Sequence, residues 1–241
     1  MTLVTRKSLF TVALLILLGA SIQPAGASVN KSIRIAAGET ADGASSVNGS
    51  ITIGEGAIVT GDVSTVNGSV RVGDNAELRD ASTVNGTIRI GPGVRAGDLE
   101  TVNGAVRIDE NVAIDGHVEA VNGAIQLGRG TTVTGHVENV NGNIELVAAT
   151  VGDDVTTVSG DVELRDAATV RGDLVVEKPS RWSWGRDRRK PEIVIGPGSR
   201  VLGTVRLEHE VELYISETAE VGGVSGVMTL EDAVRFGGER P

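Results

Sequence analysis

Two histidines in this 241-residue chain are spaced so that they could share chemistry. His117 and His136 lie nineteen residues apart in the similar contexts GHVEA and GHVEN, and Glu119 or Glu138 follows two positions later. Residues two apart in a strand point to the same face, so imidazole and carboxylate groups would converge as they do at metal sites. Because Asp62 has the same phase in TGDVST, a solvent-facing turn explains the position better, and we predict no metal and no cofactor.

The most regular polar feature is an asparagine that recurs every eighteen or nineteen residues, usually within Val-Asn-Gly. Such a column could bind a ligand. However, Asn also tolerates a left-handed backbone, and stacked side-chain amides hydrogen-bond along their axis. We therefore interpret the column as a structural Asn ladder. Its members are Asn30, Asn48, Asn67, Asn85, Asn103, Asn122 and Asn141.

One basic segment, residues 177–191 (EKPSRWSWGRDRRKP), interrupts the pattern of an otherwise acidic chain. It holds both tryptophans, six basic residues and two acidic residues. Aromatic and cationic side chains together suit anionic lipid headgroups, acidic glycans or a partner protein, although a solvated surface loop would have the same composition. The candidate interaction residues are Trp182, Trp184, Arg181, Arg186, Arg188, Arg189 and Lys190.

A second charged feature changes sign along the chain. One polar position of the repeat is basic in the earlier units and acidic in the later ones. A head-to-tail contact would bring these opposite charges together and set polarity, whereas the alternative is a solvated face. The residues are Arg34, Arg71, Arg89 and Arg107, followed by Glu145 and Glu163.

Composition excludes several functions. The chain has no cysteine, so disulfides and Cys-based zinc or redox sites are impossible. A formal net charge of −10 argues against nucleic acid as a partner. Ser-His-Asp and Gly-rich phosphate motifs are absent, and uniform repeats leave no long loops to build a catalytic cleft. We therefore predict that the protein is not an enzyme.

The elements that position these residues come from the repeat itself. Each unit opens as V-N-G-x-[IV]-x-[IVL], in which apolar, mostly β-branched residues flank a polar one, as in a half-buried strand. A looser second half has turns of Gly, Asp and Asn, which tolerate left-handed angles. We predict an all-β protein, a single-stranded parallel β-helix (β-solenoid) of about ten coils of 18–19 residues, roughly 45–50 Å long. Thin layers of Val, Ile and Leu explain why only 2% of residues are aromatic.

Three segments divide the chain. Residues 1–27 have the basic n-region, apolar run and Ala25-Gly26-Ala27 site of a secretory signal peptide, with an uncleaved anchor as the alternative. Residues 28–227 are the solenoid, with the 177–191 insertion, and 228–241 form a C-terminal cap or tail. We expect export to the periplasm or cell surface.

The repeats resemble bactofilins, a family of polymer-forming cytoskeletal proteins, over about residues 29–227. The similarity is carried by GSITIGEGAIVTGDVSTVNGSVRVG (49–73), GAIQLGRGTTVTGHVENVNG (123–142) and VIGPGSRVLGTVRLE (194–208). The resemblance implies a right-handed triangular β-helix that polymerises end to end without nucleotide, as a scaffold near membrane and cell wall. Bactofilins typically act in the cytoplasm, whereas this chain carries a signal segment.

Two other similarities compete with this assignment. Segments such as 53–58 (IGEGAI) also look like hexapeptide acyltransferases, whose coils are left-handed, but repeated nineteen-residue spacings disrupt strict six-residue faces. Exported adhesin-like solenoids have similar small-residue repeats. We therefore expect a self-associating structural protein of the cell envelope. The alternative is a monomeric adhesin, or a glycan- or lipid-binding module, acting through 177–191.

Overall fold

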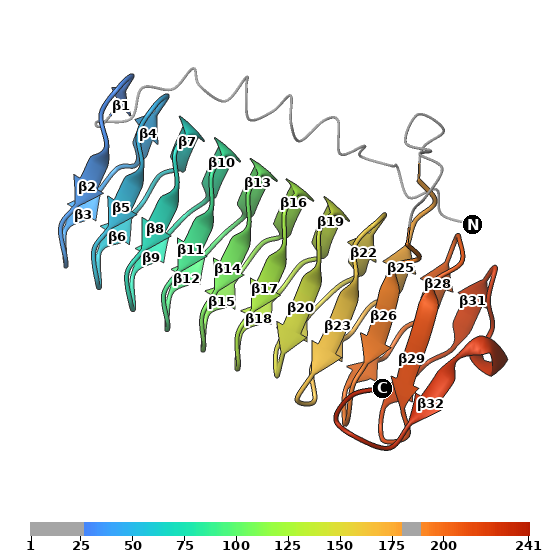
Figure 1. The fold of residues 1–241 in the computed structure, drawn as a ribbon. Helices are drawn as coiled ribbons and strands as arrows, with labels where there is room; N and C mark the ends of the chain where they lie inside the picture. Colours follow the sequence, from blue (N-terminus) through green and yellow to red (C-terminus); the bar gives the residue numbers. More distant parts are fainter. Residues whose placement is uncertain (1–26, 180–188) are drawn as a thin grey trace, which may run out of the picture.

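A computed structural model describes residues 27–179 and 189–241, which form a stack of coils along one axis (Figure 1). The strands make three parallel sheets, here called A, B and C, of 11, 11 and 10 strands. The chain visits A, B and C in turn, and each strand pairs with its counterparts one coil before and after. The predicted all-β parallel solenoid of about ten coils is confirmed.

Sheet A holds the longest strands of the regular coils, and five of them end on the repeat asparagine. Its strands are β1 (Ala27–Ser28), β4 (Ala44–Ser46), β7 (Val63–Asn67), β10 (Ala81–Asn85), β13 (Leu99–Asn103), β16 (Val118–Asn122), β19 (Val137–Asn141), β22 (Val155–Thr157), β25 (Leu174–Val176), β28 (Val205–Leu207) and β31 (Val224–Gly226).

Sheet B contains the repeat position whose side chain is basic in the earlier coils and acidic in the later ones. Its strands are β2 (Ile33–Ile35), β5 (Ile51–Ile53), β8 (Val70–Val72), β11 (Ile88–Ile90), β14 (Val106–Ile108), β17 (Ile125–Leu127), β20 (Ile144–Val147), β23 (Val162–Arg165), β26 (Glu192–Ile195), β29 (Glu212–Ser216) and β32 (Val234–Phe236). The 177–191 insertion lies at the corner between sheets A and B, where β25 gives way to β26.

Sheet C is made of two-residue strands. They are β3 (Thr40–Ala41), β6 (Ile58–Val59), β9 (Glu77–Leu78), β12 (Arg95–Ala96), β15 (Ala113–Ile114), β18 (Thr132–Val133), β21 (Thr150–Val151), β24 (Thr169–Val170), β27 (Arg200–Val201) and β30 (Glu220–Val221). A short 3-10 helix, η3 (Leu230–Asp232), is the one helical element of the described ranges, in which no helix is long and apolar enough to cross a membrane.

In-register stacking creates the core, because it places each apolar side chain above a similar one. Ile88 pairs with Val70 on one side and Val106 on the other, and Arg89 pairs with Arg71 and Arg107. The alternating strand buries the aliphatic residues and leaves the arginines exposed. The largest fully buried side chains are all Ile or Leu.

The corner between sheets A and B requires glycine because successive coils approach closely there. A Cβ at Gly104 would overlap the carbonyl oxygen of Gly86, and one at Gly123 would overlap that of Gly104. The expectation that the ladder asparagines adopt left-handed angles is wrong. Among the described non-Gly residues, positive φ occurs instead at the B–C corner, for example at Asn75 (54°) and Asn111 (57°).

The C-terminal segment 228–241 adds a strand as well as a tail. β32 pairs with β29 at the edge of sheet B, and Phe236 is buried there. The chain then turns back along the outside of sheet B, where the Arg240 guanidinium lies 3.4 Å from Glu163 (Figure 1). β30, β31 and β32 therefore remain the outermost strands of sheets C, A and B.

Candidate interaction surfaces

The Asn ladder forms one continuous chain of side-chain hydrogen bonds. Each Nδ2 donates to the Oδ1 of the asparagine one coil earlier, at 2.8–3.0 Å, from Asn141 back to Asn30. All seven side chains are at the surface, directly at the A–B corner. Each amide uses one of its two N–H groups in the ladder, so the other can face a ligand or solvent.

The two histidines stack rather than converge on a common ligand. Their ring centroids are 4.0 Å apart at an interplanar angle of 25°. His117 Nδ1 accepts the backbone N–H of His136 at 3.2 Å, and His136 Nε2 lies 3.0 Å from Glu119 Oε1. Within residues 27–179 and 189–241, no group of three or more His, Asp or Glu side chains is placed to hold a metal.

In other coils, the corner that holds His117 and His136 has aspartates that bind the backbone of the next coil. Asp80 Oδ1 accepts the Asp98 N–H at 2.9 Å, and Asp98 Oδ1 accepts the His117 N–H at 2.8 Å. Side chains at this corner therefore satisfy the backbone of the next coil, and His117 continues the series with its ring nitrogen.

Three glutamates stack beside the histidines on the outer face of sheet A. Glu119 lies in register with Glu100 and Glu138. Burial and then the Glu119 carboxylate raise the pKa of Glu100 and of Glu138 to about 7. The hydrogen bond that the His136 ring donates to the Glu119 carboxylate raises the pKa of His136. This part of the molecule consequently changes charge near neutral pH.

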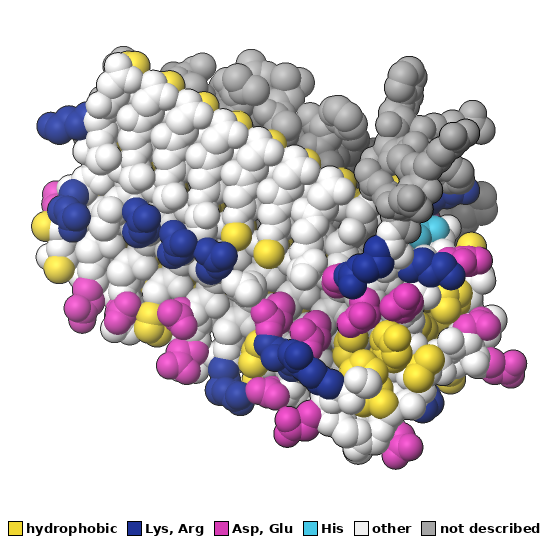
Figure 2. Space-filling view, in the orientation of Figure 1, with side chains coloured by type: hydrophobic (Ala, Val, Ile, Leu, Met, Phe, Trp, Pro, Cys, Tyr) yellow, Lys and Arg dark blue, Asp and Glu magenta, His cyan; other side chains and the backbone are white. Residues whose placement is uncertain are grey.

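The sign-changing column runs along the outer face of sheet B. Figure 2 shows a row of basic side chains across the earlier coils and acidic ones toward the C-terminal end. The basic members are exposed, whereas Glu145 and Glu163 are half-buried. Arg165 pairs with Glu145 and lies 3.6 Å from Glu163, so one guanidinium lies beside both carboxylates of the acidic half.

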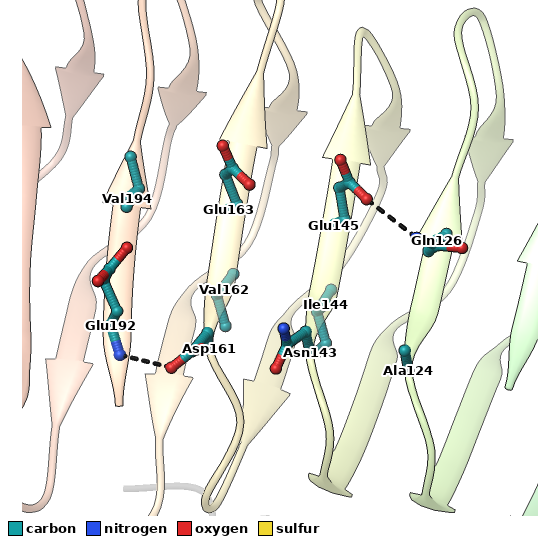
Figure 3. A pocket seen from close by; sticks show the side chains of 10 residues that line it. All are labelled: Ala124, Gln126, Asn143, Ile144, Glu145, Asp161, Val162, Glu163, Glu192 and Val194. Carbon is teal, nitrogen blue, oxygen red and sulfur yellow. Dashed lines mark hydrogen bonds between the residues drawn. The ribbon is translucent and has the colours of Figure 1, made fainter. Parts of the chain in front are cut away.

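A shallow pocket of about 270 Å³ lies on the acidic half of this face (Figure 3). Gln126 Nε2 donates to Glu145 Oε2 at 3.1 Å, and the Glu192 N–H donates to Asp161 Oδ1 at 2.8 Å. The lining comes from four neighbouring strands of sheet B and their preceding corners. It comprises Ala124, Gln126, Asn143, Ile144, Glu145, Asp161, Val162, Glu163, Glu192 and Val194.

The insertion is anchored at its C-terminal root. Arg189 forms an ion pair with Asp161, and Lys190 Nζ lies 2.7 Å from Glu210 Oε2. Two of the seven predicted interaction residues therefore have carboxylate partners within the protein. The other five, Arg181, Trp182, Trp184, Arg186 and Arg188, lie outside the described residues.

His209, which the repeat pattern leaves isolated, contacts the backbone of a distant coil. Its ring nitrogens lie 3.1 Å from the Glu210 carbonyl oxygen and 3.2 Å from the Val158 carbonyl oxygen. Val158 follows β22 and His209 follows β28, so the contact joins corners that are two coils apart in sheet A. Sequence periodicity gives no signal for such a contact.

Comparison with known protein families, curated proteins and solved structures finds no match to this chain.

Proposed function

We propose that this protein is an exported structural protein that self-associates end to end, in the manner implied by its resemblance to bactofilins. The observation that carries the proposal is the state of the core at the two ends. Of the described residues, the apolar ones that pack on the core yet stay partly exposed all belong to the first and last coils. They are Ile33, Ala41, Ala219, Val221, Val224, Met228 and Ala233.

The backbone supports the same contact. Strands β1, β2 and β3 are outermost at one end, and β31, β32 and β30 are outermost at the other. Edge strands present unpaired N–H and C=O groups that template further strands. Because both ends have the same three-sheet cross-section, a second copy could continue all three sheets. A head-to-tail contact of this kind is heterologous and generates open filaments.

The proposal assigns a scaffold role at the cell envelope, based on the signal-like segment 1–27, and no catalytic step. Its partners are further copies of the same chain and, through the 177–191 insertion, the membrane surface or cell-wall glycan. A monomeric adhesin using that insertion is the competing function. The ion pairs of Arg189 and Lys190 at the root of the insertion favour the structural role, because they use cations that the adhesin would present.

A substitution in the first strand of sheet B tests the end contact. The Ile33 N–H donates to Ser50 in the next coil at 3.0 Å. Since N–H groups alternate in direction along a strand, the Arg34 N–H faces the open end. Proline at this position removes that donor without breaking a hydrogen bond among the described residues. Ile33 already has the extended conformation that a following proline favours.

We expect Arg34→Pro to abolish concentration-dependent assembly measured by light scattering, and Arg34→Gln to assemble like the wild type. The two variants lose the same charge, so their difference isolates the backbone donor. Equal assembly of both variants would refute the end-to-end contact. Loss of lipid or glycan binding on deletion of 177–191, in a protein that never assembles, would support the adhesin instead.

A further inference from the structure

Sheet B carries three successive arginines without a counter-ion. Arg71, Arg89 and Arg107 are in direct register, so they are about 4.8 Å apart along the axis. No described carboxylate lies within ion-pair distance of them, and Arg107 Nε donates instead to the Gln126 amide oxygen at 3.2 Å. Like charges stacked in register are destabilising. An acidic protein that leaves such a row unpaired has a surface suited to an external anion.

Other arginines of the same protein show how unusual this is. Most of those outside the row have a carboxylate partner, although all three sheets offer similar exposed positions. The paired ones are Arg79, Arg95, Arg129, Arg165, Arg189, Arg200, Arg206 and Arg240. Arg34, Arg171 and Arg235 also have no ion pair among the described residues, but only Arg71, Arg89 and Arg107 stack on one another in register.

Hydroxyl groups lie on the Asn-ladder side of the first two arginines, at Ser69 and Thr87, whereas Ala105 takes this position beside Arg107. Ser32 and Ser50 continue the hydroxyl column into the two preceding coils. Ser32, Ser50 and Ser69 each accept the backbone N–H one coil later, at 3.2–3.3 Å. Each hydroxyl keeps its own hydrogen available to donate outward. Beyond them lie the amides of the Asn ladder. The strip thus offers cations and amides in parallel columns with one common repeat, and hydroxyl donors beside Arg71 and Arg89.

Acidic side chains limit the opposite side of the row. Glu55, Asp74 and Asp109 are exposed at the B–C corner. They would repel an anion that drifted toward that edge. A bound polyanion is therefore confined between the arginine row and the Asn ladder, parallel to the solenoid axis.

We propose that this strip binds an extended linear polysaccharide that carries carboxylate groups. Guanidinium forks bind carboxylates with two parallel hydrogen bonds, and the hydroxyl and amide columns suit sugar hydroxyls. The coil rise of about 4.8 Å is close to the advance per sugar of an extended glycan. An extended peptide presents side chains on one face every 6.6–6.8 Å, which is about two residues of strand rise. This spacing does not match the coil rise of the arginine row. This site is independent of the end-to-end contact.

The structure disfavours a second copy as the occupant. The carboxylates that another sheet B would bring, Glu145 and Glu163, already pair with Arg165. Glu163 also has Arg240 within 3.4 Å. A free acidic glycan offers carboxylates that have no such partner.

Binding of polygalacturonate to the full chain at low salt tests the proposal. Each exposed ion pair contributes little alone, so all three arginines are replaced together. We expect the triple variant Arg71→Gln/Arg89→Gln/Arg107→Gln to bind about 10- to 100-fold more weakly than the wild type. The matched control is Arg79→Gln/Arg95→Gln/Arg129→Gln. It removes the same charge elsewhere and should weaken binding less than about 2-fold. Circular dichroism verifies the fold of both variants. Equal losses in the two variants would show a net-charge effect and overturn the proposal.

Two further comparisons keep the proposal falsifiable if the glutamine variant misfolds. The variant Arg71→Lys/Arg89→Lys/Arg107→Lys keeps the charge but loses the planar fork, so binding should fall by about 3- to 10-fold. Wild-type affinity in that variant would refute carboxylate recognition by the guanidinium groups. Polyglutamate of similar charge should compete poorly. If it binds as tightly as polygalacturonate, the site detects charge alone and the glycan assignment is wrong.

Discussion

The earlier coils and the later coils of this solenoid are held together differently. In the earlier coils, polar side chains bond to their counterparts one coil away, eighteen or nineteen residues apart, as in the pairs Asn85–Asn67 and Asn122–Asn103. In the later coils, contacts join segments 51 and 77 residues apart, through His209–Val158 and Arg240–Glu163.

This difference separates two kinds of stability. A regular array is stabilised by nearest-neighbour terms, so each coil depends on the next. The coils after Asn141 have no Asn ladder, and there a returning tail adds to the ion pairs that occur along the whole solenoid. On sheet B, the arginines of the regular coils have no ion-pair partner among the described residues, whereas Arg165 in the later coils pairs with Glu145.

The largest expected effect comes from the tight corner of the regular coils. Gly104→Ala would place a Cβ against the Gly86 carbonyl oxygen, so we expect a loss of more than about 3 kcal/mol of unfolding free energy. Gly223→Ala is the matched control in the last coil, where nothing lies within 4 Å of the added Cβ, and it should change stability by less than about 0.5 kcal/mol. Thermal denaturation of both variants measures the difference, and similar melting temperatures would contradict the proposed close coil contact.

The two halves of the sheet B face should respond in opposite ways to loss of an arginine. Arg165→Met leaves Glu145 and Glu163 half-buried beside each other, and we expect a loss of about 1–3 kcal/mol. Arg89→Met removes an unpaired charge from a row of like charges and should be neutral or slightly stabilising, within about 0.5 kcal/mol. Urea unfolding tests the pair. Equal destabilisation by the two substitutions would mean that the arginine row has internal partners.

The glutamate stack on sheet A predicts a pH dependence. Burial raises the pKa of Glu138 from 4.5 to about 7. The protonated carboxyl therefore contributes fully to the folding stability below pH 4.5, and this stability is lost as the pH rises through about 7. The raised pKa of His136 acts in the same direction. Glu138→Gln should therefore match the wild type near pH 4.5 and be more stable by about 1–2 kcal/mol at pH 8. A constant difference across that range would contradict the burial of the Glu138 carboxyl.

The smallest expected effect is a gain at the left-handed corner. Ala148 has a φ of 47° at the position where neighbouring coils have Asn111 or Gly130. Ala148→Gly relieves that strain and should stabilise the protein by about 0.5–1 kcal/mol. A matched substitution at Ala149, which is buried with no such angle, should destabilise it. Destabilisation by both changes would place the left-handed corner elsewhere.

The repeat predicts the fold because every coil obeys the same local rules. Val-Asn-Gly spacing sets the A–B corner, and the alternation around Arg89 identifies the buried and exposed sides of sheet B. Left-handed residues were expected at that corner and occur at Asn75 and Asn111 instead. The reason is that close coil contact, rather than backbone handedness, selects glycine after the ladder asparagine.

The contacts of the later coils could not be predicted in the same way. Arg165 reaches Glu145 from two residues beyond Glu163, which stacks on Glu145, whereas the return of Arg240 to Glu163 joins residues that no periodicity relates. Glu192 meets Asp161 because β26, which follows the insertion in the sequence, pairs in register with β23. Such contacts depend on where the chain returns in space, which a repeat pattern does not encode.

Electron microscopy of the purified protein over a range of concentrations tests the central claim most directly. If the open ends stack, the protein forms filaments one solenoid wide, with an axial repeat of roughly 50 Å for eleven coils. Discrete rods of that length at every concentration would contradict end-to-end self-association.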